Sequence, residues 1–390
     1  MRVSFRWTTR RCNINWRRPD RASACETSRP RYVGTPRHRS IQPDLRRRKN
    51  ELSRDTRRRM QSILLVNLPF FALVLLGYVA AQQRLLPEAA IPGLNAYVLF
   101  FALPCLLFRF GSSMPLAQLI DPMLMAIYAL CSLIMVTLTI AATLRRGTQT
   151  RGVDLKNAAF GALVAAFPNS GFMGVPLLVA LFGQAAAGPV ISTLLFDMVI
   201  TSTVCLTLAQ AQQKRSNGET QGSVLAVVGR SFLGAATNPQ PWAILLGALT
   251  AGTALQLPGP ITQVVRMLAE SASPVALFTI GAVLWRARQH THTRTALRDY
   301  LPVALIKLLV HPLLVGVAGL GARAAGFQVP GFGLMVLMMA AALPSASGAS
   351  LLAERYGADN GRVARIIMTS TVLAFGSFSA IAWRFGGHAL

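Results

Sequence analysis

Two prolines stand inside apolar stretches beside small polar residues. Pro168 is followed by Asn169, Ser170 and Gly171, and Pro344 is followed by Ser345 and then Ser347. A proline removes one helical hydrogen bond and distorts the preceding turn, and inside a bilayer the released carbonyl groups need new partners. We therefore expect two unwound segments whose half-helix N-termini offer N–H groups and partial positive charge to an anionic substrate. The structural alternative is an ordinary kink, with glycines allowing close helix packing.

Three ionisable side chains also fall within apolar stretches, where they are costly and usually functional. Asp197 lies far from either end of its stretch, whereas Lys307 and His311 are four residues apart and share a helix face. We expect these three residues to couple transport to a proton or another cation. Each has a structural alternative: Asp197 forms a hydrogen bond in the helix bundle or pairs with Lys307, Lys307 extends towards the cytoplasmic surface, and His311 bonds a carbonyl released by Pro312.

The composition indicates lipid as the solvent for most of the chain. Of 390 residues, 53% are hydrophobic and only 14% are charged, against roughly a quarter in soluble domains. The net charge of +25 does not indicate nucleic-acid binding, because 19 of the 39 Lys and Arg lie in residues 1–60. The sequence contains none of the common catalytic, nucleotide-binding or metal-binding motifs. We expect no enzyme activity, no cofactor and no metal site.

Ten apolar stretches are long enough to cross a bilayer, which takes about 20 residues. They are 62–81, 91–110, 122–144, 158–182, 187–209, 240–257, 261–285, 299–321, 331–352 and 363–384. Lys and Arg cluster in the loops after odd-numbered stretches, so those loops should be cytoplasmic. Arg355 and Arg362 belong to this count, in the loop after the ninth stretch.

A polar connection divides the ten stretches into five and five. We expect a first five-helix repeat at 60–209, a cytoplasmic linker at 210–238 and a second repeat at 239–390. An odd number of helices inverts the second repeat in the membrane, which is the usual architecture for alternating access. The sequence thus predicts an all-α integral membrane protein with broken helices at the fourth and ninth positions.

Residues 1–59 form a basic leader that conflicts with this orientation, since both ends of the helical body should lie outside. The leader could hold the N-terminus inside, or act as a targeting segment, although it lacks the apolar core of a secretory signal. Translation could also start at Met60, directly before the first stretch, and this interpretation is favoured. The leader is expected to be disordered or absent from the mature protein.

Several motifs, in this order, resemble the auxin efflux carrier family, which includes bacterial malate permease-like carriers. They are Leu94-Asn95, Leu103-Pro104, the run Asn169 to Pro176, Pro274 to Phe278, Lys307 with His311-Pro312, Pro344-Ser345-Ala346 and the run Leu352 to Gly357. The resemblance implies crossover helices four and nine, with an organic anion bound where they cross. We assign Asn95 to this expected site. Related sequences often have asparagine where this chain has Gly348, which weakens the polar contact expected from the Pro344 side.

We therefore expect a carrier of small organic anions in the cell membrane, which is the inner membrane in a Gram-negative bacterium. The first alternative is a cation-coupled antiporter or sodium-dependent symporter of a related inverted-repeat class. Acidic residues should cluster at the crossover of an antiporter, and only Asp197 qualifies. A channel or a membrane-embedded enzyme is the more distant alternative. The sequence leaves open the substrate, the coupling by proton or sodium, and whether the protein forms a homodimer.

Overall fold

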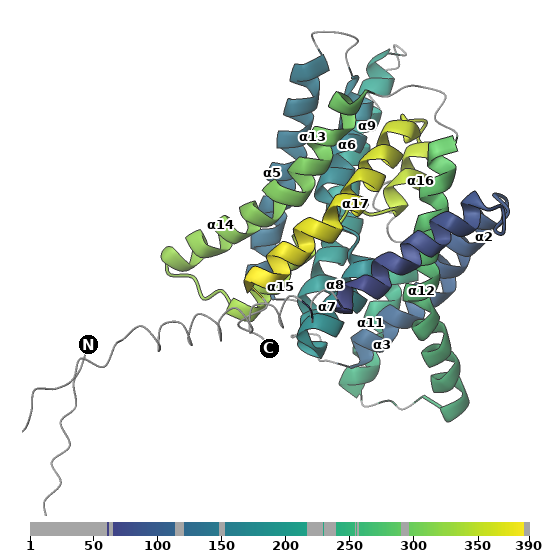
Figure 1. The fold of residues 1–390 in the computed structure, drawn as a ribbon. Helices are drawn as coiled ribbons and strands as arrows, with labels where there is room; N and C mark the ends of the chain where they lie inside the picture. The colour runs from purple at the N-terminus through teal and green to yellow at the C-terminus, as the bar shows by residue number, and fades with distance from the viewer. Residues whose placement is uncertain are drawn as a thin grey trace, which may run out of the picture. The chain divides into compact units, whose positions relative to one another are not determined.

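A computed structural model describes residues 65–113, 121–147, 153–216, 239–253, 257–289 and 296–385, together with residues 61, 229 and 255. All of these lie in one compact unit, Ser53–Leu390. The predicted leader 1–59 lies outside the described residues, as does most of the predicted linker 210–238. The described part of the chain is all helical, apart from connecting segments (Figure 1).

The helices follow one another with short connections. The first is Leu65–Gln82. It is followed by α2 (Ala90–Tyr97), η1 (Val98–Ala102), α3 (Leu103–Ser112), α5 (Pro122–Gly147), α6 (Leu155–Ala166), η2 (Ser170–Gly174), α7 (Val175–Phe182), η3 (Gln184–Ala186), α8 (Ala187–Phe196), η4 (Asp197–Thr201), α9 (Ser202–Ser216), α11 (Pro239–Thr253), α12 (Gly259–Gln289), α13 (Leu297–Leu305), η5 (Ile306–Val310), α14 (His311–Ala324), α15 (Gly331–Ala341), α16 (Gly348–Arg355) and α17 (Asn360–Phe385).

Within the part of the chain that the structure describes, seven helices are long and apolar enough to cross a membrane. They are Leu65–Gln82, Ala90–Ser112, Pro122–Leu144, Gln184–Gln210, Gly259–Arg286, Leu297–Ala324 and Asn360–Arg384. The other three predicted stretches correspond to shorter helices. The stretch at 240–257 forms α11, while 158–182 and 331–352 are each divided into two helical pieces, with the interruptions at Pro168 and Pro344.

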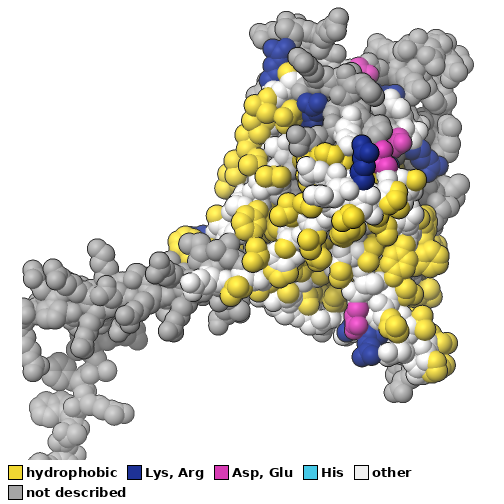
Figure 2. Space-filling view, turned by 45° about the vertical axis from the view of Figure 1, so that its right-hand side comes forward, with side chains coloured by type: hydrophobic (Ala, Val, Ile, Leu, Met, Phe, Trp, Pro, Cys, Tyr) yellow, Lys and Arg dark blue, Asp and Glu magenta, His cyan; other side chains and the backbone are white. Residues whose placement is uncertain are grey.

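Hydrophobic side chains cover the outside of this helical body. Figure 2 shows them over the flank of the visible face, with charged side chains gathered towards its two ends. Large exposed residues come from several helices, among them Leu75, Leu246, Leu313 and Leu320. Such a surface is unfavourable in water but favourable against lipid tails, which places these helices in a bilayer.

Proline explains most of the π-helical turns. The described residues contain four of them, and η1, η2 and η5 each precede a helix that begins with a residue followed by proline: Leu103-Pro104, Val175-Pro176 and His311-Pro312. Because proline has no N–H to donate to the preceding turn, the wider turn accommodates the missing bond. The fourth, η4, starts at Asp197 and leads into α9, which has no proline.

Glycines bring the first helix close to α12. A Cβ atom placed on Gly281 would lie 1.9 Å from the carbonyl oxygen of Val74, and one on Gly77 would lie 1.8 Å from that of Phe278. Small residues at such contacts allow backbones to approach, which is how helices associate in lipid. The contact therefore requires glycine at both positions.

We expect Gly281→Leu to destabilise the protein by about 3 kcal/mol or more, because the added side chain must push the two backbones apart. The measurement is the thermal unfolding midpoint of the purified protein in detergent. Gly376→Leu is the matched control, since a Cβ at Gly376 meets nothing within 4 Å. Equal midpoints for the two variants would contradict the close-packing account.

Candidate functional site

The two interruptions lie against each other as extended segments. Pro168 and Ser345 form an antiparallel bridge. The N–H of Asn169 donates to the carbonyl of Pro344 at 2.8 Å, and the N–H of Ala346 donates to the carbonyl of Phe167 at 3.0 Å. Each segment therefore satisfies backbone groups that the other has released, which is what an interruption at membrane depth requires.

Two side chains satisfy further backbone groups beside the second interruption. The hydroxyl of Ser370 accepts from the N–H of Ser345 at 3.2 Å. The ammonium of Lys307 donates to the carbonyl of Ala341, the last residue of α15, at 2.9 Å. A cation at the C-terminal end of a helix is favoured by the helix dipole, so Lys307 stabilises the point where α15 stops.

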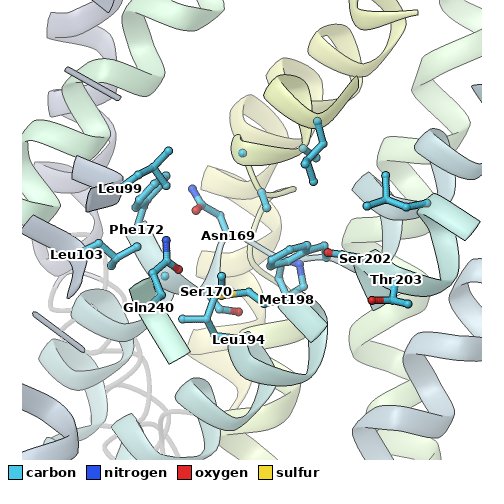
Figure 3. A pocket seen from close by; sticks show the side chains of 18 of the residues that line it. Leu99, Leu103, Asn169, Ser170, Phe172, Leu194, Met198, Ser202, Thr203 and Gln240 are labelled. Carbon is cyan, nitrogen blue, oxygen red and sulfur yellow. The ribbon is translucent and has the colours of Figure 1, made fainter. Parts of the chain in front are cut away.

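A cavity of about 310 Å³ opens beside the paired segments. Its walls come from helices far apart in the sequence, and Figure 3 shows several of the side chains that surround it. Apolar walls are provided by Leu99, Leu103, Phe167, Pro168, Phe172, Leu194, Met198, Leu206, Ala346, Ala349 and Leu352. The other lining residues are Asn169, Ser170, Gly171, Ser202, Thr203, Gln240, Gly348, Arg355 and Tyr356.

Asn169 presents an amide group to this cavity. Its side chain is 6% exposed and makes no hydrogen bond within the described structure, so its donor and acceptor are available to a ligand. Ser170 is fully buried, and its hydroxyl lies 3.3 Å from that of Thr193 on α8. The two residues follow Pro168 directly, so the interruption itself places them at the cavity wall.

The electrostatics of the cavity favour an anion. Among the described residues that line it, Arg355 carries the only charge and none is acidic. The half-helix Ser170–Phe182 and the helix α16 both begin at the cavity wall, with Ser170 and Gly348 as their first residues. The N–H of Ser170 donates to Pro168, and those of Ala349 and Ser350 donate to Ala346 and Ser347, so the two helix starts contribute the partial positive charge of the helix dipole. A carboxylate is the complementary ligand.

The predicted substrate residues fall into three groups. Pro168, Asn169, Ser170 and Gly171 line the cavity. Asn95 and Ser347 line a smaller recess of about 20 Å³, which shares Leu99, Phe172 and Gly348 with the cavity. Pro344 and Ser345 do not reach either wall: they provide the backbone pairing, and the buried Ser345 hydroxyl has no partner.

The three predicted coupling residues lie together outside the cavity lining, fully buried. Asp197, in η4, accepts from the Tyr128 hydroxyl at 2.5 Å through Oδ2 and from the Thr201 hydroxyl at 2.7 Å through Oδ1. Lys307 Nζ lies 3.0 Å from Nδ1 of His311. The Tyr128 ring contacts the His311 ring with centroids 5.8 Å apart, which connects the two pairs. We refer to Tyr128, Asp197, Thr201, Lys307 and His311 as the buried polar cluster.

This geometry corrects three of the structural alternatives. Lys307 does not extend to the surface, because its side chain is fully buried and bonds Ala341. His311 bonds no carbonyl among the described residues: its Nδ1 faces Nζ of Lys307, and its Nε2 has no partner there. Asp197 and Lys307 form no direct ion pair within 4 Å in the described structure; Asp197 instead makes hydrogen bonds within the bundle, to Tyr128 and Thr201.

Several site residues were missed by sequence reasoning. Arg355 was counted as a cytoplasmic loop charge, although it belongs to a motif quoted for the family resemblance. Ser202 lies five residues after Asp197, a spacing that could have placed it near the same region, and Gln240 opens the sixth stretch. Tyr128 is the only ionisable residue in the middle of the third stretch besides Cys131, and this is the signal that could have identified it.

The described residues are all helical apart from connecting segments, and they include seven membrane-length helices and a cavity at two interrupted helices, which together define a multi-pass integral membrane protein. The chain belongs to the Mem_trans family, described as "Membrane transport protein", whose profile matches residues 63–382. This family membership, together with the relatives below, confirms the resemblance to the auxin efflux carriers.

The relatives bear names of transporters. A Rhizobium meliloti (strain 1021) protein named "Putative malonate transporter" is 26% identical over 325 residues, covering 83% of this chain and 96% of the relative. An "Uncharacterized transporter" of Methanothermobacter thermautotrophicus is 28% identical, covering 79% and 93%. Auxin efflux carrier component 8 of Arabidopsis thaliana is 20% identical, covering 65% and 79%.

Proposed function

We propose that this protein is a secondary carrier of small organic anions, such as dicarboxylates or auxin-like carboxylates. The observation that carries the proposal is the cavity at the paired interruptions, where two helix N-termini and Arg355 provide positive charge and no described lining residue is acidic. Pro168, Asn169, Ser170 and Gly171 form the substrate site, while Asn95 and Ser347 extend it into the adjoining recess. Pro344 and Ser345 hold the second segment in position.

The proposal includes alternating access by an inverted repeat of two five-helix halves. In this repeat, the interrupted fourth and ninth helices cross. Contacts between corresponding elements of the proposed halves agree with it: α3 packs on α12, and α5 packs on α14. The fourth and ninth segments pair directly at Pro168 and Ser345. Such a repeat lets one half rock or slide against the other around a fixed site.

The alternative, a carrier that exchanges cations, is less well supported. A cation at the crossover needs acidic ligands, whereas the described lining residues of the cavity have none. The described residues also contain no group of three or more His, Cys, Asp or Glu side chains that could hold a metal ion. The names of the malonate and auxin relatives agree with a carboxylate substrate for this chain.

The proposed function is tested with the full chain reconstituted into liposomes. Malonate, malate and indole-3-acetate are first compared by thermal stabilisation of the purified protein, because a ligand of the folded state raises its stability. Radiolabelled substrate is then followed by counterflow. We expect at least one carboxylate to stabilise the protein and to accumulate in a protein-dependent manner. If cations stabilised the protein and were transported, while none of the carboxylates did either, the proposal would be contradicted.

Gly348 determines the space available at the substrate site. It lines both the cavity and the recess, and a Cβ placed there meets nothing within 4 Å. We expect Gly348→Asn to fold normally and to weaken binding of indole-3-acetate about tenfold relative to malonate, because the amide occupies room that only a large substrate needs. Gly348→Ala is the matched control and should preserve the preference. The measurement is competition between indole-3-acetate and malonate in the counterflow assay. An unchanged preference in Gly348→Asn would contradict this assignment.

A further inference from the structure

The π-helical turn at Asp197 has no local cause in the sequence. The other three described π-helical turns precede a proline, whereas η4 leads into Ser202 and Thr203. Turns of this kind inside α-helices occur frequently at functional sites. Within η4, Met198 forms part of the cavity wall, whereas Asp197 is fully buried and lies outside the lining.

The partners of the Asp197 carboxylate are hydroxyl groups. Tyr128 and Thr201 each donate to one of its oxygens, and the Thr201 hydroxyl lies 2.9 Å from that of Ser132. A hydroxyl can accept as well as donate. When Asp197 carries a proton, it can donate to the Thr201 hydroxyl, and Thr201 can then donate its own hydrogen bond to the Ser132 hydroxyl, with no further proton transferred. The arrangement therefore serves both the charged and the neutral carboxyl group, unlike a cap made by backbone N–H groups.

The same distances argue against a sodium ion in this cluster. Adjacent oxygens are within hydrogen-bonding distance of one another, at 2.5 to 2.9 Å. Oxygens that share one cation carry no hydrogen between them, repel one another and stand further apart. The only nearby cationic side chain, Lys307, is directed to Ala341 and His311. A proton fits these distances, whereas a sodium ion would require the oxygens to move apart.

The cluster is connected to the substrate site at two points. The Ser202 hydroxyl, on the cavity wall, donates to the backbone carbonyl of Asp197 at 2.8 Å. Lys307 holds the end of α15, directly before the segment that pairs with Pro168. A movement of either interrupted helix therefore changes the surroundings of the carboxyl group, which is the requirement for linked binding.

We propose that Asp197 is the proton-binding residue of this carrier, with Tyr128 as its positioning residue, so that each transport cycle moves one proton with the anion. The proposal rests on the carrier function proposed above. A proton adds to a carboxylate oxygen and is released from it on the other side, and no other bond changes. The protonated cluster has one more positive charge, which offsets one negative charge of the carboxylate substrate.

The ionisable groups around Asp197 come from four elements. Tyr128 and Cys131 belong to α5, Cys205 to α9, Lys307 to η5 and His311 to α14, where it acts through Lys307. Neither α8 nor α15 contains a titratable residue, and α6 contains only Lys156, in its first turn. Asp197 is thus the only carboxyl group among these described residues, and its replacement removes it.

The test uses proteoliposomes of the full chain with a pH indicator inside, and malonate as the probe. For the wild type we expect malonate uptake to be accompanied by proton uptake, with no dependence on sodium when choline replaces it. In Asp197→Asn the proton flux per malonate should fall at least tenfold while malonate exchange persists. A proton flux that persists in Asp197→Asn, or a wild type that needs sodium, would overturn the proposal.

Tyr128→Phe keeps the carboxyl group and removes one hydrogen bond to it. In the wild type, the Tyr128 hydrogen bond stabilises the charged carboxylate, so its removal lets Asp197 hold its proton to a higher pH. We therefore expect the pH of half-maximal malonate transport to rise by about one unit. Tyr97→Phe is the matched control, since it removes a hydroxyl 2.7 Å from Ser271 and away from the cluster. An unshifted profile in Tyr128→Phe would overturn the proposal even if Asp197→Asn were inactive.

The outcomes separate this inference from the proposed function. Malonate transport without proton movement would contradict the proton site at Asp197, but it would leave the proposed carrier function standing. If the wild type moves none of malonate, malate and indole-3-acetate, the carrier function fails, and the proton site fails with it.

Discussion

Asn169→Ala is expected to reduce carboxylate transport by about 30-fold. The Asn169 amide faces the cavity with no partner in the described structure, so we expect it to bond the substrate carboxylate directly. A hydrogen bond to a charged group contributes about 2 kcal/mol, and each 1.4 kcal/mol corresponds to about tenfold. The measurement is initial counterflow rate in proteoliposomes, at substrate concentrations well below saturation and normalised to folded protein.

Asn67→Ala provides the matched control for this loss. Asn67 is also buried, but it lies in the first helix and donates to the Ser379 hydroxyl at 3.0 Å, away from the cavity. Its replacement should lower thermal stability without changing transport per folded molecule. If Asn169→Ala transported at the wild-type rate, the substrate would not be bound by the helix that Pro168 interrupts.

Arg362→Ala is expected to lower the free energy of unfolding by about 3 kcal/mol. The side chain is 3% exposed, and its guanidinium donates to the carbonyls of Asn157 at 2.8 Å and Asp299 at 3.0 Å. It lies over Gly161, where a Cβ would stand 3.0 Å from its Nη1 atom. Removal deletes two hydrogen bonds from a charged donor, at about 1.5 to 3 kcal/mol each at most, and leaves a cavity beside α6.

The stability of this variant is measured by thermal unfolding in detergent, with Arg298→Ala as the control. The side chain of Arg298 is 70% exposed, and its contact with Asp299 is 4.0 Å long. Exposed pairs contribute little, so the control should remain within about 0.5 kcal/mol of the wild type. Similar losses in both variants would show that Arg362 does not join α6, α13 and α17.

Hydropathy predicted most of the helices, because a bilayer imposes length and composition on each span. The stretch predicted at 122–144 is part of α5, and the one at 261–285 is part of α12. Helix ends were less predictable. The helix α12 extends to Gln289, since interfacial residues continue a helix once the apolar part has formed.

Proline alone did not identify the interruptions. Pro274 lies inside α12 and Pro302 inside α13, and neither divides its helix. Pro168 and Pro344 do so in company with small polar neighbours and with a second extended segment that accepts the released bonds. That pairing joins residues far apart in the chain, so it depends on tertiary structure that local sequence does not encode.

Charge counting had a similar limit at the candidate site. Arg355 was predicted to lie in the loop after the ninth stretch, whereas it is the last residue of α16 and lines the cavity, a position that depends on how α16 packs. Of the five residues in the buried polar cluster, the sequence singled out three: Asp197, Lys307 and His311. Tyr128 and Thr201 were not, because tyrosine and threonine are common in apolar helices and only the fold shows which of them meet a carboxylate.

We expect the organic anion to bind at the paired segments around Pro168 and Ser345. An electron cryo-microscopy structure of the full chain in lipid nanodiscs, with the carboxylate that stabilises it most, tests this claim directly. We predict ligand density within hydrogen-bonding distance of the Asn169 amide, inside the cavity that Arg355 and Gly348 line. Density for the ligand at another place in the molecule, with this cavity filled only by water, would contradict the account.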